Sequence, residues 1–318
     1  MSYQAPRWLP GGNLQTIFPA TLIARLKVDY QRERWATPDG DFIDVDFIHG
    51  IPGKPFVVLF HGLESSSNSH YAKAMMAAIS QLGWSGAVPH FRGCSGEINL
   101  APRFYHSGDS TEVDWIVRRL RSRAEGKFYA VGASLGGNVL LRWLGESQHQ
   151  ADIVDAACAV SAPLDLTQAG RTLSKGFNRL YGYHFLQSLK PKCLLKLEQF
   201  PKLFVRERML GARNLYQFDD IVTAPLHGYR SADDYWNRAS SNHVLPNITV
   251  PTLLLNARND PFLPGHYLPE VVNPALTIEY PATGGHVGFA QGPWPGNVSW
   301  LPQRLIRFLE GSTELVAV

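Results

Sequence analysis

The chain has few cysteines, little net charge and no long apolar run. Its 318 residues include only three cysteines, Cys94, Cys158 and Cys193, and 18% of the residues are charged. Cysteines so far apart form neither a disulfide framework nor a cluster of metal ligands, which favours a reducing compartment. A formal net charge of +3 is too small to indicate a nucleic-acid partner, and we expect none.

Membrane-spanning and secreted classes are also disfavoured. A helix that crosses a bilayer needs ~18 or more consecutive apolar residues, and no stretch of the sequence reaches that length. The first residues lack the basic and then apolar segments of a signal peptide. Because 45% of the residues are hydrophobic, the composition is that of a folded globular protein. We therefore expect a cytoplasmic protein.

Apolar runs and helical repeats alternate along most of the chain. Continuous apolar runs predict strands covered on both faces, and apolar residues at helical spacing predict helices between them. This alternation indicates an α/β fold with a mostly parallel sheet and helices on both faces. Two earlier runs flank Pro38-Asp39-Gly40 and predict a hairpin of two edge strands. The predicted hairpin strands are 30–36 and 41–48, the buried strands 55–60, 86–91, 128–131, 155–161, 250–256 and 276–280, and the helices 69–82, 109–120 and 300–309.

The alternation stops at Leu166 and returns at residue 249. Residues 167–248 contain helical segments at 177–189, 194–210 and 232–240 but no buried strand. Helices inserted between two strands of one sheet form a cap. We therefore expect an α/β core made of residues 1–166 and 249–318, with residues 167–248 as a helical cap.

The predicted cap is basic, with 12 Lys and Arg against six Asp and Glu. Within it, basic residues alternate with apolar ones. One interpretation is a lid that makes weak peripheral contact with anionic lipid. The other, which we favour, is a solvated basic face whose apolar residues turn to the site. The residues concerned are Lys190, Lys192, Lys196, Lys202, Arg206 and Arg208.

The stretch KFYAVGASLGGNVLL, residues 127–141, combines a strand, a sharp turn and a helix. The turn places Ser134 in a Gly-x-Ser-x-Gly pattern, which in this context is a nucleophile elbow. Strand and helix crowd together at such a turn, so Gly132 and Gly136 are expected where a side chain would clash. The helix N-terminus would direct backbone N–H groups toward the space above the Ser134 hydroxyl.

A serine nucleophile needs a base and an acid that orients the base. After Ser134, one predicted strand is followed by Asp260 and the next by His286. The carboxyl ends of parallel strands share one edge of a sheet, so the three side chains would meet there. We predict that His286 is the general base and that Asp260 orients it. Asp165, which follows an earlier strand, is the second candidate for the acid.

An oxyanion hole needs two backbone donors, one after the nucleophile and one after an earlier strand. We predict the N–H groups of Leu135 and Leu63 for these positions. His61, in the same loop as Leu63, is expected to be structural. Arg92 and His106 could line the entrance, although Arg92 is equally suited to bracing its own loop through an ion pair.

Several motifs together resemble those of a known group. HGLES, HFRGCSGE, GASLGGN, NARNDPF and GGHVGF, with WLPGGNLQTIFPA at the front, are similar to the YheT-like branch of the α/β-hydrolases. The match runs nearly end to end. It implies the α/β-hydrolase fold, a triad of Ser134, Asp260 and His286, and hydrolysis of carboxylic esters. Members of the wider family are described as short-chain carboxylesterases or as acylglycerol and phospholipid lipases.

Three functions stay open at this point. The first is a serine esterase that acts on small-molecule esters and needs no metal or organic cofactor. The second is an acylglycerol lipase or phospholipase that acts on longer acyl chains at a membrane surface. The third is a hydrolase-like scaffold that binds a ligand or partner without turnover. All three catalytic residue types are present, which favours the first two.

Overall fold

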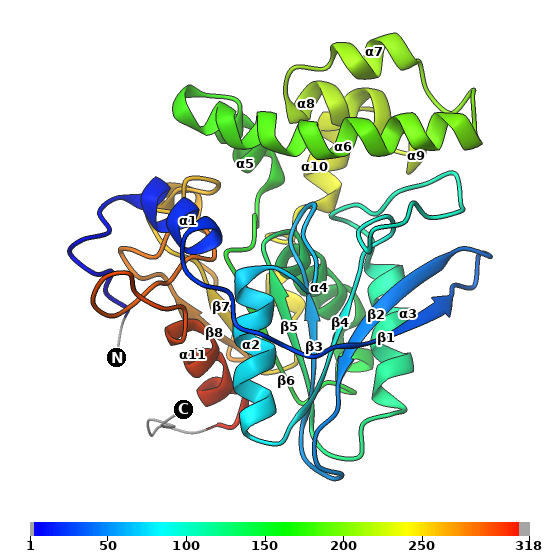
Figure 1. Ribbon diagram of the computed structural model, residues 1–318. Coiled ribbons are helices and arrows are strands. Elements are labelled where there is room, and N and C mark those ends of the chain that lie inside the picture. The colour runs from blue at the N-terminus through cyan, green and yellow to red at the C-terminus, as the bar shows by residue number, and fades with distance from the viewer. Residues whose placement is uncertain (1–2, 312–318) are drawn as a thin grey trace.

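A computed structural model describes residues 3–311, and within them eight strands form one sheet between two layers of helices (Figure 1). The strand order is β1-β2-β4-β3-β5-β6-β7-β8. Strands β3 to β8 run parallel, whereas β2 is antiparallel to both of its neighbours. The predicted mostly parallel α/β sheet is therefore confirmed. The strands are β1 Gln31–Ala36, β2 Phe42–Ile48, β3 Phe56–Phe60, β4 Ser85–Pro89, β5 Phe128–Ala133, β6 Ala156–Val160, β7 Thr252–Leu255 and β8 Leu276–Glu279.

Each face of the sheet is covered by its own pair of helices. In β3, Val57 and Leu59 pack in the cluster that includes α2 and α11, whereas Val58 and Phe60 pack in the cluster that includes α3 and α4. A strand covered on both sides has no polar face, which explains its continuous apolar run. The helices on the two faces are α2 His70–Gln81, α3 Ser110–Arg121, α4 Leu135–Ser147 and α11 Trp300–Leu309, whereas α1 Gly12–Thr21 lies against the loops after β7 and β8.

The predicted hairpin forms, but only one of its two strands lies at the edge of the sheet. Strand β1 lies at the edge, but β2 lies between β1 and β4. All seven residues of β2 are buried, including Asp44 and Asp46. The two carboxylates are paired with Arg34 and Arg32 of β1, at 2.8 and 2.7 Å. These ion pairs let β2 bury its two aspartates in the interior of the sheet.

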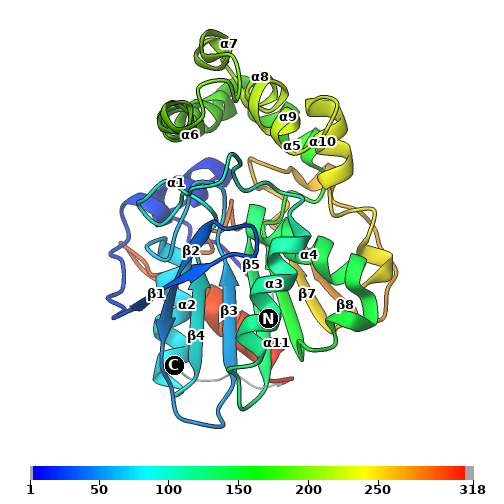
Figure 2. The same cartoon turned by 90° about the vertical axis from the view of Figure 1, so that its right-hand side faces the viewer.

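Only helices lie between β6 and β7 in the described chain, and Figures 1 and 2 show them stacked over the carboxyl edge of the sheet. They are α5 Leu166–Leu173, α6 Arg179–Gln199, α7 Arg206–Gly211, α8 Leu215–Phe218, α9 Ala224–Leu226 and α10 Ala232–Ala239, with a π-helical turn, η3, at Asp219–Thr223. On this arrangement we propose that residues 167–248 form a cap on a core made of residues 1–166 and 249–318. The proposed core range also includes residues 1–2 and 312–318, which lie outside the described residues.

The predicted break between two helices near residue 190 is wrong. Helix α6 runs for 21 residues with Pro191 inside it. Proline removes one backbone hydrogen bond and normally ends or kinks a helix. Here both halves are anchored, because Leu186 before the proline and Cys193 and Leu197 after it are buried. Tertiary packing therefore overrides the local signal.

Candidate active site

Ser134 lies in the turn between β5 and α4. Its backbone is in the left-handed region, with φ 53° and ψ −122°, which is strained for a residue other than glycine. The Ser134 N–H donates to the Val160 carbonyl at 2.8 Å and ties the turn to β6. A Cβ atom on Gly132 would lie 2.4 Å from the Gly136 oxygen, and one on Gly136 would lie 2.2 Å from the Phe60 oxygen. The predicted clash at both glycines is confirmed.

The side chains predicted as nucleophile, base and acid form one chain of hydrogen bonds. His286 Nε2 lies 2.8 Å from Ser134 Oγ, and His286 Nδ1 lies 2.9 Å from Asp260 Oδ2. Asp260 is buried, and its other oxygen accepts the Phe262 N–H at 2.8 Å. A carboxylate accepts but does not donate, so Nδ1 carries the imidazole proton and Nε2 is free to accept the serine proton.

The imidazole is also held from the side. The Phe262 ring stacks on the His286 ring, with centroids 3.9 Å apart and an interplanar angle of 14°. Because Phe262 follows Asp260 by two residues, one loop supplies both the predicted acid and the ring that limits rotation of the predicted base. The stack keeps the imidazole in the plane that joins Ser134 to Asp260.

Asp165, the second candidate for the acid, has a different role. It occupies the N-cap position of α5, and its side chain accepts the Gln168 N–H at 2.9 Å. A carboxylate in this position satisfies one of the unpaired N–H groups at the start of the helix. The structure brings Asp260, and not Asp165, to His286.

His61 controls the peptide that precedes the predicted oxyanion donor. The Phe91 N–H donates to His61 Nε2 at 3.1 Å, so the ring proton is on Nδ1, which lies 2.8 Å from the Gly62 oxygen. Burial lowers the pKa of His61 to about 3 and keeps the ring neutral. The Ser65 N–H donates to the same carbonyl at 3.2 Å. His61 is therefore structural, as expected.

This anchoring directs the Leu63 N–H. In a trans peptide the carbonyl and the N–H point in opposite directions, so the Leu63 N–H points away from the groups that hold the Gly62 carbonyl. No hydrogen bond between described residues uses this N–H, and Leu135 occupies the first position of α4, where an N–H has no partner within the helix. Leu63, Leu135 and Ser134 line the same cavity. The N–H groups of Leu63 and Leu135 thus remain candidates for the oxyanion hole.

The front of the chain contributes to the site in a way that the sequence did not reveal. Helix α1 lies beside the loops after β7 and β8. Gln15 Oε1 accepts from the Asn259 side chain and the Gly284 N–H, both at 2.9 Å, and its amide nitrogen donates to the Leu9 oxygen at 2.8 Å. Thr16 Oγ1 accepts the His286 N–H at 2.8 Å. Two adjacent residues of α1 thus connect the loop that carries Asp260 to the loop that carries His286.

The nearest sequence signal for this contact was the front motif itself, WLPGGNLQTIFPA. The motif carries part of the resemblance, but nothing in its spacing links it to Asp260 or His286. Glycines close the contact, since a Cβ atom on Gly288 would lie 1.8 Å from the Gln15 oxygen. The Gln15 and Asn259 side chains are 244 residues apart in the sequence, so only the folded structure reveals their hydrogen bond.

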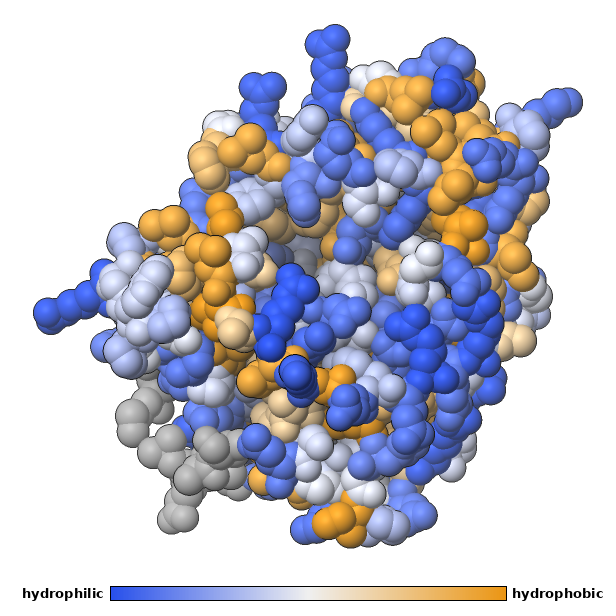
Figure 3. Space-filling model, in the orientation of Figure 1, coloured by the Kyte–Doolittle hydropathy of each residue, from blue (hydrophilic) through white to orange (hydrophobic). Residues whose placement is uncertain are grey.

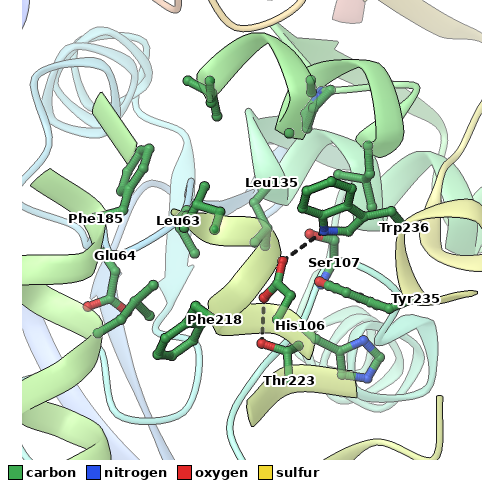
Figure 4. A pocket seen from close by; sticks show the side chains of 18 of the residues that line it. Leu63, Glu64, His106, Ser107, Leu135, Phe185, Phe218, Thr223, Tyr235 and Trp236 are labelled. Atoms are coloured by element: carbon green, nitrogen blue, oxygen red, sulfur yellow. Dashed lines mark hydrogen bonds between the residues drawn. The ribbon is translucent and has the colours of Figure 1, made fainter. Parts of the chain in front are cut away.

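Ser134 lines a cavity whose walls come from both the core and the proposed cap. Figure 4 shows other residues that line it. The cavity encloses about 990 Å³ of empty space, counting its open mouth. The lining is largely apolar, and much of it comes from the helices between β6 and β7. Apolar contributors include Leu63, Leu135, Leu166, Leu173, Phe185, Leu189, Phe218, Trp236 and Phe262.

Three charged residues line this cavity. Glu64 and Lys192 form an ion pair at 2.8 Å. Asp219 forms no ion pair with a cation among the described residues. Its carboxylate accepts the Thr223 hydroxyl at 2.6 Å and the Trp236 indole N–H at 2.7 Å, drawn as dashed lines in Figure 4. Burial raises the pKa of Asp219 to about 6, because an isolated carboxylate is costly to keep charged there.

The two residues suggested for the entrance separate. Arg92 is buried in a cluster of carboxylates, 2.8 Å from Asp39 and Asp41 and 2.5 Å from Glu112. It braces its loop and does not line the cavity. His106 does line the cavity, and burial lowers the pKa of its imidazole to about 3, so it is a neutral wall residue.

The chain matches known hydrolases over most of its length. Residues 55–293 match the family model described as the alpha/beta hydrolase fold. The chain belongs to the α/β-hydrolase family. It is 38% identical over 301 residues to "Putative esterase YheT" of Escherichia coli (strain K12), a match that covers 92% of this chain and 88% of that protein.

More distant members of the family extend the comparison. The chain is 28% identical over 326 residues to "Phospholipase ABHD3" of Mus musculus, covering 98% of this chain and 79% of that one. The solved esterase Pf2001 of Pyrococcus furiosus shares the fold with a TM-score of 0.54 and 17% identity, over 92% of this chain and 97% of that one. The predicted YheT-like, α/β-hydrolase assignment is confirmed. Between residues 3 and 311, no helix is long and apolar enough to cross a membrane.

Proposed function

We propose that this α/β-hydrolase cleaves carboxylic esters of small molecules through Ser134, His286 and Asp260. The observation that carries the proposal is the continuous hydrogen-bond chain from Ser134 Oγ through His286 to the buried Asp260, with links of 2.8 and 2.9 Å. A hydroxyl, an imidazole and a carboxylate in this order form the arrangement that activates a serine for acyl transfer.

The reaction follows from these positions. Ser134 Oγ attacks the ester carbonyl while His286 Nε2 takes the serine proton, and the N–H groups of Leu63 and Leu135 receive the oxyanion. His286 then gives its proton to the departing alcohol and leaves an acyl-enzyme. Water repeats the sequence, with His286 as base, and releases the acid. Asp260 holds Nδ1–H toward itself and stabilises the imidazolium that forms twice in each cycle.

The cavity indicates which part of the substrate it receives. Its walls are mostly aliphatic and aromatic, so the transfer of an acyl chain from water into the cavity is favourable. We propose that residues 167–248 act as a cap that shapes this space, because they supply Leu173, Phe185, Leu189 and Phe218. An acyl group that carries a negative charge would be disfavoured, because the Asp219 carboxylate lines the same cavity.

Labelling with a fluorophosphonate probe tests the chemistry. We expect an adduct on Ser134 that is lost in Ser134→Ala and retained in Ser122→Ala, a serine that is exposed on a loop. p-Nitrophenyl esters of increasing acyl length then test the substrate class. We expect the highest kcat/KM with short chains. A folded protein that never labels would support the binding scaffold instead.

An acylglycerol lipase or phospholipase acting at a membrane surface is the second candidate. The observation in its favour is that the proposed cap exposes large apolar side chains, interspersed with polar ones along the upper part of the molecule in Figure 3. The exposed apolar residues of this region are Phe177, Leu180, Tyr183, Leu195, Val205, Leu210 and Tyr216. This pattern is typical of surfaces that enter a lipid interface.

The basic residues of the cap support this candidate less than the sequence suggested. Lys190 donates to the carbonyls of Leu210 and Ala212, and Lys192 pairs with Glu64. Lys196 is buried and donates to the Ala101 carbonyl. Half of the six basic residues are thus committed to contacts inside the protein.

Cosedimentation with vesicles separates the two candidates. Binding to vesicles rich in anionic lipid, with kcat/KM that rises with acyl length, would favour the interfacial lipase. Equal and negligible binding to anionic and neutral vesicles would exclude the lipid-contacting cap.

A further inference from the structure

Glu64 follows the proposed oxyanion donor Leu63 and adopts an unusual backbone conformation. Its φ is 53°, in the left-handed region that a residue with a side chain rarely occupies. Such a conformation persists only where the surroundings hold it. The Glu64 N–H donates to the Tyr105 hydroxyl at 2.7 Å, and the same hydroxyl donates to Glu64 Oε1 at 2.9 Å. The Tyr105 hydroxyl therefore holds both the backbone and the side chain of Glu64.

The Glu64 carboxylate also reaches the proposed cap. Lys192 Nζ lies 2.9 Å from Oε1 and 2.8 Å from Oε2, and the Ser188 hydroxyl donates to Oε2. Ser188 and Lys192 are one turn apart on α6, so both face the same carboxylate. The Glu64 side chain is only 4% exposed, whereas that of Lys192 is 23% exposed.

The partners of Glu64 therefore come from both sides of the cavity. Tyr105 belongs to the core, and Ser188 and Lys192 belong to α6. If α6 moved away, the carboxylate would lose the only cation with which it pairs among residues 3–311, and one hydroxyl. A buried carboxylate without a partner must gain water or a proton. Either change would release the loop at the residue next to Leu63.

We propose that Glu64 is a positioning residue that couples docking of helix α6 to the geometry of the oxyanion loop. This inference rests on the proposed function. With α6 docked, Glu64 keeps its left-handed backbone and the Leu63 N–H stays directed into the cavity. With α6 displaced, the loop relaxes and the site loses one oxyanion donor while Ser134, His286 and Asp260 remain in place. Cap position thereby controls catalysis, rather than only access to the cavity.

The coupling makes a prediction that a purely structural ion pair does not. An oxyanion donor acts on the transition state, so loosening it lowers kcat and leaves KM nearly unchanged. Complete loss of one donor costs ~100- to 1,000-fold in kcat, and a donor that is mobile but present should cost less. We expect Lys192→Met to lower kcat by about 10- to 100-fold.

The test compares two ketones in Lys192→Met and in the wild type. A trifluoromethyl alkyl ketone adds to Ser134 and places an oxyanion in the hole, whereas the matching methyl ketone only fills the cavity. We expect the affinity for the trifluoromethyl ketone to fall by the same factor as kcat, and the affinity for the methyl ketone to change less than twofold. Lys202→Met is the matched control, because Lys202 is exposed and makes no ion pair or hydrogen bond within the described chain.

Two further variants keep the proposal falsifiable. Lys192→Arg should restore most of the activity, since it keeps the cation. Glu64→Gln should lower kcat like Lys192→Met, and the double variant should be no worse than either single one. Unchanged kcat in Lys192→Met, or equal loss of affinity for both ketones, would overturn the proposal. A wild-type protein in which Ser134 reacts with neither the ketone nor a fluorophosphonate would overturn the proposed function itself.

Discussion

Replacing Thr16 by Val tests whether the front of the chain positions His286, the proposed catalytic base. Thr16 Oγ1 accepts the His286 N–H at 2.8 Å and donates to the Gly12 oxygen at 2.7 Å. Valine has nearly the same shape but no hydroxyl, so the substitution removes the acceptor without opening a cavity. The His286 N–H then has to find another partner or stay unpaired.

The structure sets the size of the effect. A buried N–H left unpaired costs about 1–3 kcal/mol. If the loop stays in place, this amount appears as a loss in the free energy of unfolding. If the loop moves to solvate the N–H, His286 leaves its 2.8 Å contact with Ser134 and the barrier rises. Since 1.36 kcal/mol corresponds to tenfold, we expect kcat to fall by about 10- to 100-fold.

The assay combines kcat for p-nitrophenyl butyrate with urea unfolding. Thr21→Val is the matched control, because Thr21 is on the same helix and its hydroxyl donates to the Ile17 oxygen at 2.8 Å, but it is exposed and away from the base loop. We expect Thr21→Val to retain full activity. A Thr16→Val protein with kcat within twofold of the wild type would refute the positioning argument, whatever its stability.

Three other substitutions follow from the geometry. Asp260→Asn should lower kcat by about 10⁴-fold with little change in KM, because the amide no longer fixes the His286 tautomer. Asp219→Asn should become more stable relative to the wild type as pH rises from 4 to 8. The native pKa of about 6 exceeds the unfolded value of 3.8, so ionisation in this window costs the wild type up to about 3 kcal/mol. Gly136→Ala should cost several kcal/mol, roughly 4 or more, since its Cβ would meet the Phe60 carbonyl at 2.2 Å.

Each of these has a clear contrary result. Steady-state kinetics in which Asp260→Asn keeps more than a tenth of the wild-type kcat would argue against its role as the orienting acid. Urea titrations at several pH values that give parallel stability curves for Asp219→Asn and the wild type would show that this carboxyl does not titrate as described. For the glycine, Gly211→Ala is the control, because a Cβ atom there has no neighbour within 4 Å. Equal thermal shifts for the two glycine variants would contradict the steric argument.

Much of the fold was predictable from local patterns. The buried strands and the helices around the sheet are confirmed because an apolar run or a 3.6-residue period depends only on neighbouring residues. The strand–turn–helix around Ser134 was predictable for the same reason. The positions of Asp260 and His286 needed one further rule, that parallel strands end at a common edge.

The errors share a physical cause. The sequence predicts separate helices at 177–189 and 194–210, but buried side chains on both sides of the expected break keep α6 continuous. The sequence predicts an edge strand at residues 41–48, but β2 lies between β1 and β4, and arginines of β1 pair with its aspartates. Lys192 and Lys196 suggested a basic surface, yet both reach partners inside the protein. In each case a contact distant in sequence outweighs a local preference.

What the sequence by itself determined is the set of chemical groups and the order in which strands deliver them: a serine on a tight turn, then an aspartate, then a histidine. Local sterics and strand polarity suffice for that. Only the tertiary structure decided which groups hold the site in register, because Gln15, Thr16, His61 and Glu64 act through hydrogen bonds to backbone and side chains brought near by folding. A hydrogen bond forms only if the distance between donor and acceptor is correct to within a few tenths of an ångström, and no sequence pattern encodes a distance that finely.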